Sequence, residues 1–285
     1  MKYLVTGAGG QLGREWVDFL KIQKVPFSDF SSVDLDITDI QQVKTVINRE
    51  IPDIVINCAA YTKVDEAEAN RDKAFLVNET GVKNLTDCCI EIGAKLVHYS
   101  TDYVFSGHQN DQNSYPDGYP ENGPIGPINI YGESKRAGER VLEKSAADWL
   151  LVRVSWLCGR YGKNFVKTMI KLSAERDQLK VVDDQTGSPT YTFDVVEKTW
   201  LLLQKEVSGT FHLASKGAVT WARFAEEIFR QRGVGIRINR VSSDEFKTAA
   251  KRPSFSLLST RKAEKCGLQM IEWKSGLGLL LQQIG

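Results

Sequence analysis

A tyrosine and a lysine four positions apart, Tyr131 and Lys135, are the residues of this sequence whose spacing most clearly suggests chemistry. Residues i and i+4 lie on one face of a helix, so the lysine ammonium can sit beneath the phenol. The pKa of a free tyrosine is about 10, and a nearby cation brings it closer to working pH. Carbonyl reduction needs such an acid, because hydride arriving at carbon leaves an alkoxide that takes up a proton. The same spacing also occurs in ordinary surface helices, so the pair needs support from the elements around it.

Thr101 and Asp102 are a second candidate pair, at the end of the apolar run that begins at Leu96-Val97. Ligands of open parallel sheets bind outside the carboxyl ends of the strands, so a hydroxyl at this place faces a site. We expect Thr101 to hydrogen-bond both a substrate oxygen and the Tyr131 hydroxyl. A helix or turn cap is the alternative role, and Asp102 fits that role equally well.

Gly7, Gly10 and Gly13 follow a buried-strand pattern at Tyr3-Leu4-Val5 and precede a helical pattern. Glycines let a backbone approach a pyrophosphate closely, and a helix N-terminus supplies free N–H groups and a favourable dipole. A tight strand-to-helix turn without a ligand uses the same residues. The order of strand, glycines and helix nevertheless favours dinucleotide binding.

The residue that ends the second strand would select between NADH and NADPH, because an acid there binds the ribose 2′-hydroxyl of NAD. Asp29 stands at this place if the strand ends early. Ser31 or Ser32 stands there if the strand ends later, and a 2′-phosphate is then tolerated. The cofactor therefore stays open between NADPH and NADH. Asp36 and Ile37, a few residues further on, are candidates to flank the adenine, although Asp36 also suits a simple turn.

The elements that must position these residues alternate between short apolar runs and helical patterns. One helix is expected to open with the capping box Thr38-x-x-Gln41. The alternation is typical of right-handed crossovers and predicts a Rossmann-like, doubly wound parallel sheet of the α/β class. The clearest strand patterns lie at residues 3–5, 54–56, 96–97 and 150–152.

The pattern changes twice along the chain. Residues 106–129 contain four prolines and four glycines, and a loop of that length is usually functional or disordered. After residue 156 helices mix with short strands such as Thr210–Leu213. We expect a dinucleotide-binding Rossmann domain over residues 1–156. Residues 157–285 are expected to form mainly a smaller mixed α/β region that binds substrate, with some segments returning to the first domain.

Composition excludes several classes of protein. Lys and Arg total 37 against 36 Asp and Glu, so the net charge is +1 and nothing favours nucleic acid or a membrane surface. No apolar run is long enough to span a bilayer, and the first residues do not resemble a signal peptide. The five cysteines form no Cys-x-x-Cys, which argues against a disulfide framework or a zinc site. We expect a cytoplasmic protein with reduced thiols.

Several groups of residues together resemble the extended short-chain dehydrogenase/reductase family. Matches run from the glycine loop to about residue 260 and cover nearly the whole chain. Within that family the chain is similar to the reductases of a dTDP-linked 4-keto sugar that complete dTDP-L-rhamnose for cell-wall polysaccharide. The most specific matches are Ser100-Thr101-Asp102-Tyr103-Val104-Phe105 and Asp184-Gln185-x-Gly187-x-Pro189-Thr190, joined by Asn57-Cys58-Ala59-Ala60-Tyr61-Thr62, Arg252-Pro253 and Tyr131-x-x-x-Lys135.

The resemblance implies reduction of the 4-keto group of dTDP-6-deoxy-L-lyxo-4-hexulose by NADPH or NADH. Tyr131 would donate the proton, while Lys135 would hold the nicotinamide ribose and lower the pKa of Tyr131. Thr101 would tune that pKa and touch the sugar, with Asp102 beside it. The cofactor would be bound by Gly7, Gly10, Gln11, Leu12, Gly13, Asp36, Ile37, Ala59, Ala60 and Tyr61 together with the catalytic tyrosine and lysine.

The resemblance also implies a set of substrate contacts. Trp156 would cover the sugar ring, with plain core packing as the alternative. Arg252 would bind the diphosphate, because a guanidinium contacts phosphate oxygens in bidentate fashion, with a surface salt bridge as the alternative. Thr62 and Val64 are weaker candidates for sugar contact.

Two other functions stay open. A nucleotide-sugar 4-epimerase of the same fold would reuse its own hydride on a tightly held NAD. A non-catalytic regulatory subunit would keep the fold as a cofactor-binding module, although the intact Thr101, Tyr131 and Lys135 favour an enzyme. No metal is expected: Glu15 on the first helix is taken to be exposed, and one glutamate is not a metal site. A homodimer and a monomer both remain open.

Overall fold

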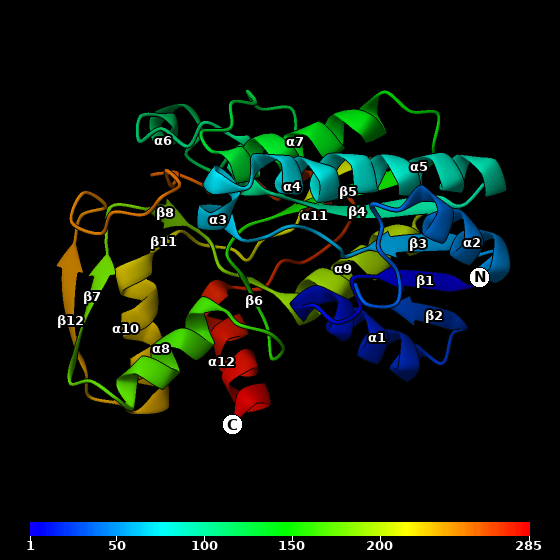
Figure 1. Ribbon diagram of the computed structural model, residues 1–285. Coiled ribbons are helices and arrows are strands. Elements are labelled where there is room, and N and C mark those ends of the chain that lie inside the picture. Colours follow the sequence, from blue (N-terminus) through cyan, green and yellow to red (C-terminus); the bar gives the residue numbers. More distant parts are fainter.

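A six-stranded parallel sheet with helices on both faces forms the centre of the computed structural model, which describes residues 1–285 (Figure 1). Its strand order is β10-β5-β4-β3-β1-β2, so the order reverses between β1 and β3. Open sheets bind ligands outside the strand ends at such a reversal. The fold is therefore the Rossmann-like α/β class expected from the alternation. The strands are β1 (Tyr3–Thr6), β2 (Phe27–Phe30), β3 (Ile54–Asn57), β4 (Lys95–Thr101), β5 (Trp149–Val154) and β10 (Gly209–His212).

Each face of the sheet has its own apolar core. One face packs against α1 (Gln11–Gln23), α9 (Thr192–Gln204) and α11 (Arg261–Lys265). The other packs against α2 (Ile40–Glu50), α5 (Gly81–Ile92) and α7 (Ile130–Glu143). The strands between the two layers are buried on both sides, which explains why they read as continuous apolar runs. The remaining helical segments near α7 are α3 (Val64–Ala69), α4 (Arg71–Phe75) and the π-helical η1 (Leu76–Thr80).

The structure revises one sequence expectation in this domain and resolves one point that was left open. Asp39, not Thr38, is the N-cap of α2, and its carboxylate accepts from the backbone N–H groups of Gln41 and Gln42. The second strand, whose end the sequence left open between Asp29 and Ser32, is an edge strand: β2 is only half-buried, and its Asp29 is exposed. An edge strand needs no continuous apolar run, so its end could not be read from the sequence.

The second region packs around a separate core at the left of Figure 1. Its helices α8 (Phe165–Ser173), α10 (Trp221–Arg232) and α12 (Trp273–Ile284) pack together on one side of the parallel pair β7 (Gln178–Val182) and β12 (Arg237–Val241), with α10 next to the strands. The chain does not stay in this region after residue 156, because α9 and β10 both belong to the central sheet and its helical layer. Four two-residue strands complete it: β6 (Leu157–Cys158), β8 (Thr186–Gly187), β9 (Thr190–Tyr191) and β11 (Val219–Thr220).

The loop over residues 106–129 has a small core of its own. After the short 3-10 turn η2 (Asp102–Val104), the loop contains the single-turn helix α6 (Asp111–Ser114). Tyr119 is fully buried and stacks on Phe105, with ring centroids 4.4 Å apart and planes 2° from parallel. The loop is thereby fixed at the carboxyl end of β4, beside Thr101. No helix in the structure has both the length and the apolar character that crossing a bilayer requires.

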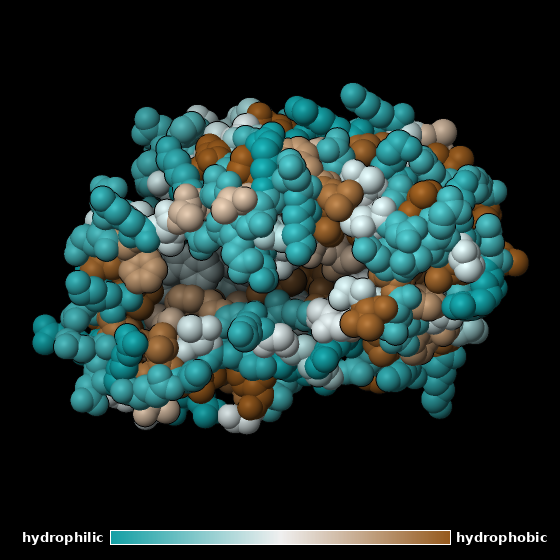
Figure 2. Space-filling view, viewed as in Figure 1, coloured by the Kyte–Doolittle hydropathy of each residue, from teal (hydrophilic) through white to brown (hydrophobic).

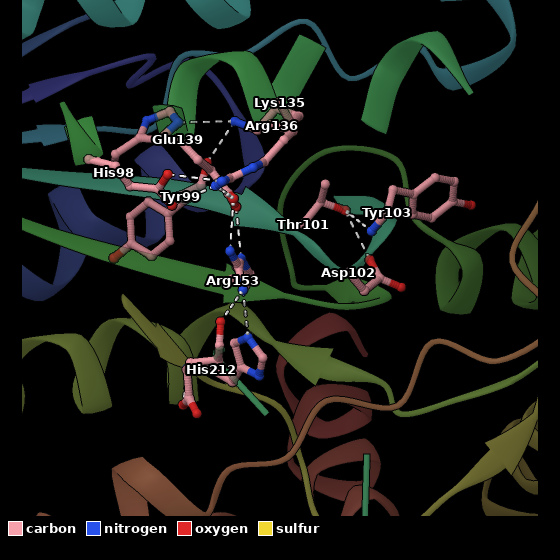
Figure 3. A network of polar contacts seen from close by, with 12 residues as sticks. His98, Tyr99, Thr101, Asp102, Tyr103, Lys135, Arg136, Glu139, Arg153 and His212 are labelled. Carbon is pink, nitrogen blue, oxygen red and sulfur yellow. Dashed lines mark hydrogen bonds and ion pairs between the residues drawn. The ribbon is translucent and has the colours of Figure 1, made fainter. Parts of the chain in front are cut away.

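A buried ion pair attaches α7 to the sheet. Glu139 on α7 is fully buried and accepts two hydrogen bonds, each 2.8 Å, from the guanidinium of Arg153 on β5 (Figure 3). Arg136 donates a third bond to the same carboxylate at 2.9 Å. A buried carboxylate is tolerated only when it is paired and hydrogen-bonded in this way. The pair therefore fixes where α7 lies on the strands.

Replacing Glu139 with leucine leaves the guanidinium of Arg153 in the core without a carboxylate partner. We expect the free energy of unfolding to fall by about 3–5 kcal/mol, measured by urea denaturation. Asp87→Ala is the control, because it removes an exposed pair with Lys83 on α5, and it should change the free energy of unfolding by less than about 1 kcal/mol. Similar losses in the two variants would contradict the role given to the buried pair.

Candidate active site

The first turn of α7 presents Tyr131 and Lys135 at the carboxyl ends of the central strands. Asn129 caps the helix, because its side-chain oxygen accepts from the backbone N–H of Gly132 at 2.8 Å. The same side chain donates to the carbonyl of Lys251 at 2.8 Å. One residue therefore starts the helix and ties it to the second region. Tyr131 is half-buried, whereas Lys135 is only 2% exposed.

Thr101 ends β4 and faces this tyrosine. Its hydroxyl donates to Asp102 at 2.9 Å and accepts from the backbone N–H of Tyr103 at 3.2 Å. The ring of Tyr103 meets the ring of Tyr131 edge to face, with centroids 5.6 Å apart. Burial raises the pKa of Tyr131 to about 12, and the Thr101 hydroxyl acts in the opposite direction. The structure thus places the Thr101 hydroxyl near enough to Tyr131 to affect the pKa of the phenol, and the role of Thr101 toward a substrate oxygen stays a prediction.

Lys135 makes different contacts from those expected. Its ammonium nitrogen donates to the carbonyl of Tyr99 at 2.6 Å and lies 3.4 Å from Nε2 of His98 (Figure 3). Burial lowers the pKa of Lys135 to about 8, against the opposing effects of Glu139 and Cys58. The polar contacts of Lys135 go to the neighbouring strand, and burial dominates the pKa of the Tyr131 phenol, so the expectation that Lys135 lowers this pKa stays a prediction.

Asp102 has a carboxylate oxygen without a partner. The residue is 3% exposed, and its Oδ2 makes no hydrogen bond in the protein. Burial raises the pKa of Asp102 to about 7, although the Thr101 hydroxyl that donates to its other oxygen acts to lower it. A buried acceptor with no partner is costly unless a ligand satisfies it. This oxygen is therefore suited to a substrate hydroxyl.

The glycine loop fits a pyrophosphate by its backbone. Gly7 has φ +65°, and a Cβ on it would lie 2.5 Å from the backbone nitrogen of Ala59. A Cβ on Gly13 would lie 2.3 Å from the carbonyl oxygen of Gly7. Gly10 is the N-cap of α1 and provides no side-chain cap, and the first turn carries no acid. The free N–H groups of a 13-residue helix are thus left for an anion.

The side chains of Gln11 and Leu12 already have partners within the protein, so the predicted contact of these residues with a cofactor would involve their backbone. The side chain of Gln11 donates to the Leu157 carbonyl at 3.1 Å and accepts from Asn164 at 2.8 Å. Leu12 is 7% exposed and belongs to the core beneath the sheet. Their side chains serve packing and the link to the second region.

The end of β2 carries a serine rather than an acid. The strand stops at Phe30, whose carbonyl accepts from Ala8 in the glycine loop at 3.0 Å. Ser31 follows, and its Cβ lies 3.5 Å from where a Cβ on Gly9 would stand. Its hydroxyl and backbone N–H donate to the carboxylate of Asp34 at 2.6 and 3.1 Å, whereas Asp29 lies one residue before the end of the strand.

Asp36 and Ile37 lie beyond this point, and their side chains already have protein partners. The carboxylate of Asp36 accepts from the N–H and hydroxyl of Thr38 at 2.9 and 2.8 Å. Ile37 is 3% exposed and packs against Gly81 of α5, where a Cβ would meet it at 2.6 Å. Their contact with an adenine stays a prediction.

The loop after β3 is held by a residue that the sequence did not single out. Ala59 and Ala60 are half-buried beside the glycine loop. The side chain of Asn78 accepts from the N–H of Tyr61 at 2.9 Å and donates to its carbonyl at 3.0 Å. Its amide also donates to Ser134 on α7 at 2.9 Å. Asn78 lies in the π-helical turn η1, and such turns are frequent at functional sites.

The predicted substrate residues Trp156, Val64 and Thr62 differ in their surroundings. Trp156 has φ +44° and stacks on Trp221, with ring centroids 3.5 Å apart. A non-glycine residue in that backbone region is strained and is often found at functional sites. Val64 is half-buried at the start of α3, and Thr62 is exposed beside it. Their contact with the sugar stays a prediction.

Arg252 has a protein partner. It binds Asp65 of α3 through two hydrogen bonds of 3.0 and 2.6 Å, which is the salt bridge weighed as its alternative role.

Arg252 also lines a cavity of about 800 Å³ between α8, β7 and residues 243–254. Lys180, Lys247 and Lys251 line the same cavity, as does Trp221. The space-filling view shows a hollow across the middle of this face (Figure 2). Sequence reasoning missed the lysines because their patterns are those of ordinary surface residues.

One expectation about α1 was wrong. Glu15 is 6% exposed, not available at the surface, because its carboxylate accepts from Thr192 at 2.8 Å and from Arg160 at 3.2 Å. The side chain was taken to be exposed, but Thr192 at the start of α9 and Arg160 both bind its carboxylate. The structure contains no cluster of three or more His, Cys, Asp or Glu side chains that could hold a metal ion.

The fold and this arrangement define a class, the nicotinamide-dependent reductases of the extended short-chain dehydrogenase type. The chain matches the family described as "RmlD substrate binding domain" over residues 1–285, and it belongs to that family. A solved dTDP-4-dehydrorhamnose reductase from Bacillus anthracis, in complex with NADP, is 41% identical with a TM-score of 0.94 and 99% coverage of both chains.

Two curated relatives are each 39% identical. The spore coat polysaccharide biosynthesis protein SpsK of Bacillus subtilis matches 99% of this chain and 97% of its own length. The dTDP-4-keto-6-deoxy-D-glucose reductase of Streptomyces niveus matches 97% of this chain and 95% of its own length.

Placing an acid at the end of β2 should change the cofactor preference. In Ser31→Asp the carboxylate would repel a 2′-phosphate and accept from a 2′-hydroxyl, so kcat/KM for NADPH relative to NADH should fall by at least about tenfold. Initial rates with each cofactor measure this ratio. Ser32→Asp, one residue further on, is the matched control; an equal change in both variants would contradict the assignment.

Proposed function

We propose that this protein reduces the 4-keto group of dTDP-6-deoxy-L-lyxo-4-hexulose, with NADPH or NADH, to give dTDP-L-rhamnose. The observation that supports this most is the meeting of Thr101, Asp102 and Tyr131 at the carboxyl end of β4, with Lys135 one helical turn away. The anion site at the start of α1 follows β1, which is separated from β4 in the sheet only by β3. A proton donor and a cofactor site thus converge on one edge of the sheet.

Tyr131 is the proton donor of the proposed reaction. When bound, the reduced nicotinamide supplies the hydride that converts the ketone carbon. The substrate oxygen then takes its proton from the phenol, which burial keeps protonated at neutral pH. Thr101 would hold its hydroxyl beside the same oxygen, and Lys135 would hold the nicotinamide ribose.

Asp102 and the cavity are assigned to substrate binding. The free oxygen of Asp102 accepts a hydrogen bond from a sugar hydroxyl, and Trp156 covers the sugar ring. The nucleoside diphosphate lies in the cavity lined by Lys247, Lys251 and Arg252, whose charges suit phosphate oxygens. The reduced cofactor and a dTDP-sugar are both intracellular metabolites, and all five cysteines are free, so we place the protein in the cytoplasm.

The reductase from Streptomyces niveus gives a specific second candidate, the dTDP-4-keto-6-deoxy-D-glucose form of the substrate. The two sugars differ in configuration, not in the group that is reduced. Tyr131 and Asp102 would serve either one, and the shape of the cavity wall selects between them.

A spectrophotometric assay separates the two substrates. NADPH or NADH is supplied with dTDP-4-keto-6-deoxyglucose, with and without a 3,5-epimerase, and loss of nicotinamide absorbance is followed. We expect oxidation only when the epimerase is present. Oxidation without it would favour the D-sugar, and none under either condition, with cofactor still bound, would favour a 4-epimerase or a non-catalytic module.

Removing one hydroxyl tests the proton donor. Tyr131→Phe keeps the ring packed against Tyr103 but has no proton to give, so kcat should fall by about 10²–10⁴-fold while NADPH affinity changes little. Tyr3→Phe is the matched control, since it deletes the same atom from the buried β1. Turnover of Tyr131→Phe at the parent rate would show that another group donates the proton.

A further inference from the structure

His98 is a buried titratable residue that the reaction above does not use. It lies on β4 three residues before Thr101 and is fully buried. Its two ring nitrogens face two different partners: Nδ1 lies 3.0 Å from the side-chain nitrogen of Asn57. Nε2 lies 3.4 Å from the side-chain nitrogen of Lys135 (Figure 3). Which nitrogen carries the proton therefore determines what Lys135 meets.

The orientation of Asn57 decides that question. Its side-chain oxygen accepts from the backbone N–H of Ala59 at 3.0 Å and from the hydroxyl of Thr6 at 2.8 Å. A backbone N–H can only donate, so the oxygen must point toward Ala59. The amide nitrogen then points at Nδ1 of His98 as a donor. Nδ1 must accept, and it carries no proton.

A neutral imidazole with Nδ1 unprotonated carries its single proton on Nε2. Burial, together with the charge of Lys135, holds the pKa of His98 well below its ordinary value, so the ring is neutral. The Nε2–H group consequently points at the side-chain nitrogen of Lys135. Against an ammonium this contact sets two donors face to face, whereas a neutral amine would accept the hydrogen bond.

The other groups around Lys135 do not cancel this effect. Its bond to the Tyr99 carbonyl can be made by an ammonium or by an amine. On its own helix Glu139 favours the charged form, but Arg153 already pairs with that carboxylate through two bonds. Cys58, in the loop after β3, favours the charged form of Lys135 only when its own thiol is ionised. Burial raises the pKa of that thiol, so it stays neutral. Tyr131, one turn away, stays neutral for the same reason.

We propose that His98, held by Asn57 as its Nε2–H tautomer, is a positioning residue that weakens the hold of Lys135 on its proton and sets the upper pH limit of ketone reduction. The inference rests on the proposed function, which gives Lys135 its part at the cofactor and beside Tyr131. A group that changes protonation near working pH can exchange protons during turnover, which a fixed cation cannot do.

Two variants should move the alkaline limb of the pH profile of kcat/KM, measured at saturating NADPH. In His98→Gln the side-chain carbonyl oxygen can turn toward Lys135 and accept a hydrogen bond from its ammonium. In Asn57→Asp the carboxylate can only accept a hydrogen bond, so Nδ1 of His98 takes the proton and Nε2 becomes an acceptor for Lys135. Both changes favour the ammonium, so the limb should move to higher pH by about one unit. A limb that stays in place in both variants would overturn the proposal.

Thr6→Val is the control variant. It removes one hydrogen bond from the same buried group but leaves Asn57 oriented by Ala59, so the alkaline limb should stay where it is. A shift as large as that of the two test variants would mean that general disturbance of the core, not the tautomer, moves the limb. Thermal unfolding of each variant confirms that the chain is folded when its profile is recorded.

A direct readout needs no variant and no activity. The chain has only three histidines, so a protein labelled with 15N-histidine gives three imidazole patterns, and His98→Gln assigns one of them. We expect the neutral Nε2–H pattern for His98 over roughly pH 6 to 9. A Nδ1–H or an imidazolium pattern would overturn the inference. An inactive parent protein with the expected pattern would instead count against the proposed function alone.

Discussion

One buried carboxylate, Glu139, holds together the charged groups on which the site depends. It accepts from Arg153 on the sheet and from Arg136 on its own helix, and it favours the charged form of Lys135. Removing any one of these charges from water is expensive, and only their mutual arrangement makes the set tolerable. The position of α7, and with it the position of the phenol of Tyr131, follows from this arrangement. The geometry of the site therefore depends on charged groups that are buried in the core.

The same principle explains why small polar side chains recur around the cofactor loops. Asn57, Asn78 and Asn129 each hold two segments that are distant in the sequence, through amide groups that donate and accept at once. An amide satisfies buried backbone groups without adding charge, which suits places where a cofactor brings its own phosphates. Each asparagine therefore fixes two distant segments of the chain relative to one another beside the reacting groups.

The sequence predicted the parts of the fold and site whose signal is local. The strand at 3–5, the glycine triplet and the Tyr131–Lys135 spacing each lie within one element and its turn, so pattern alone located them. The partners of His98, the stacking of Trp156 on Trp221 and the burial of Glu15 depend on segments about 40 to 180 residues apart. No periodicity contains that information. The cap at Asp39 was missed because Thr38 and Asp39 are both good cap residues, and only backbone angles distinguish them.

The return of α9 and β10 to the central sheet has a consequence for how such proteins diversify. Without these segments β5 would be an open edge and one face of the sheet would lose part of its cover. The substrate region cannot be exchanged between relatives as a cassette by a single crossover after residue 156. New sugar preferences would have to arise by point substitutions or short insertions in the cavity wall, within a scaffold whose chain path stays the same.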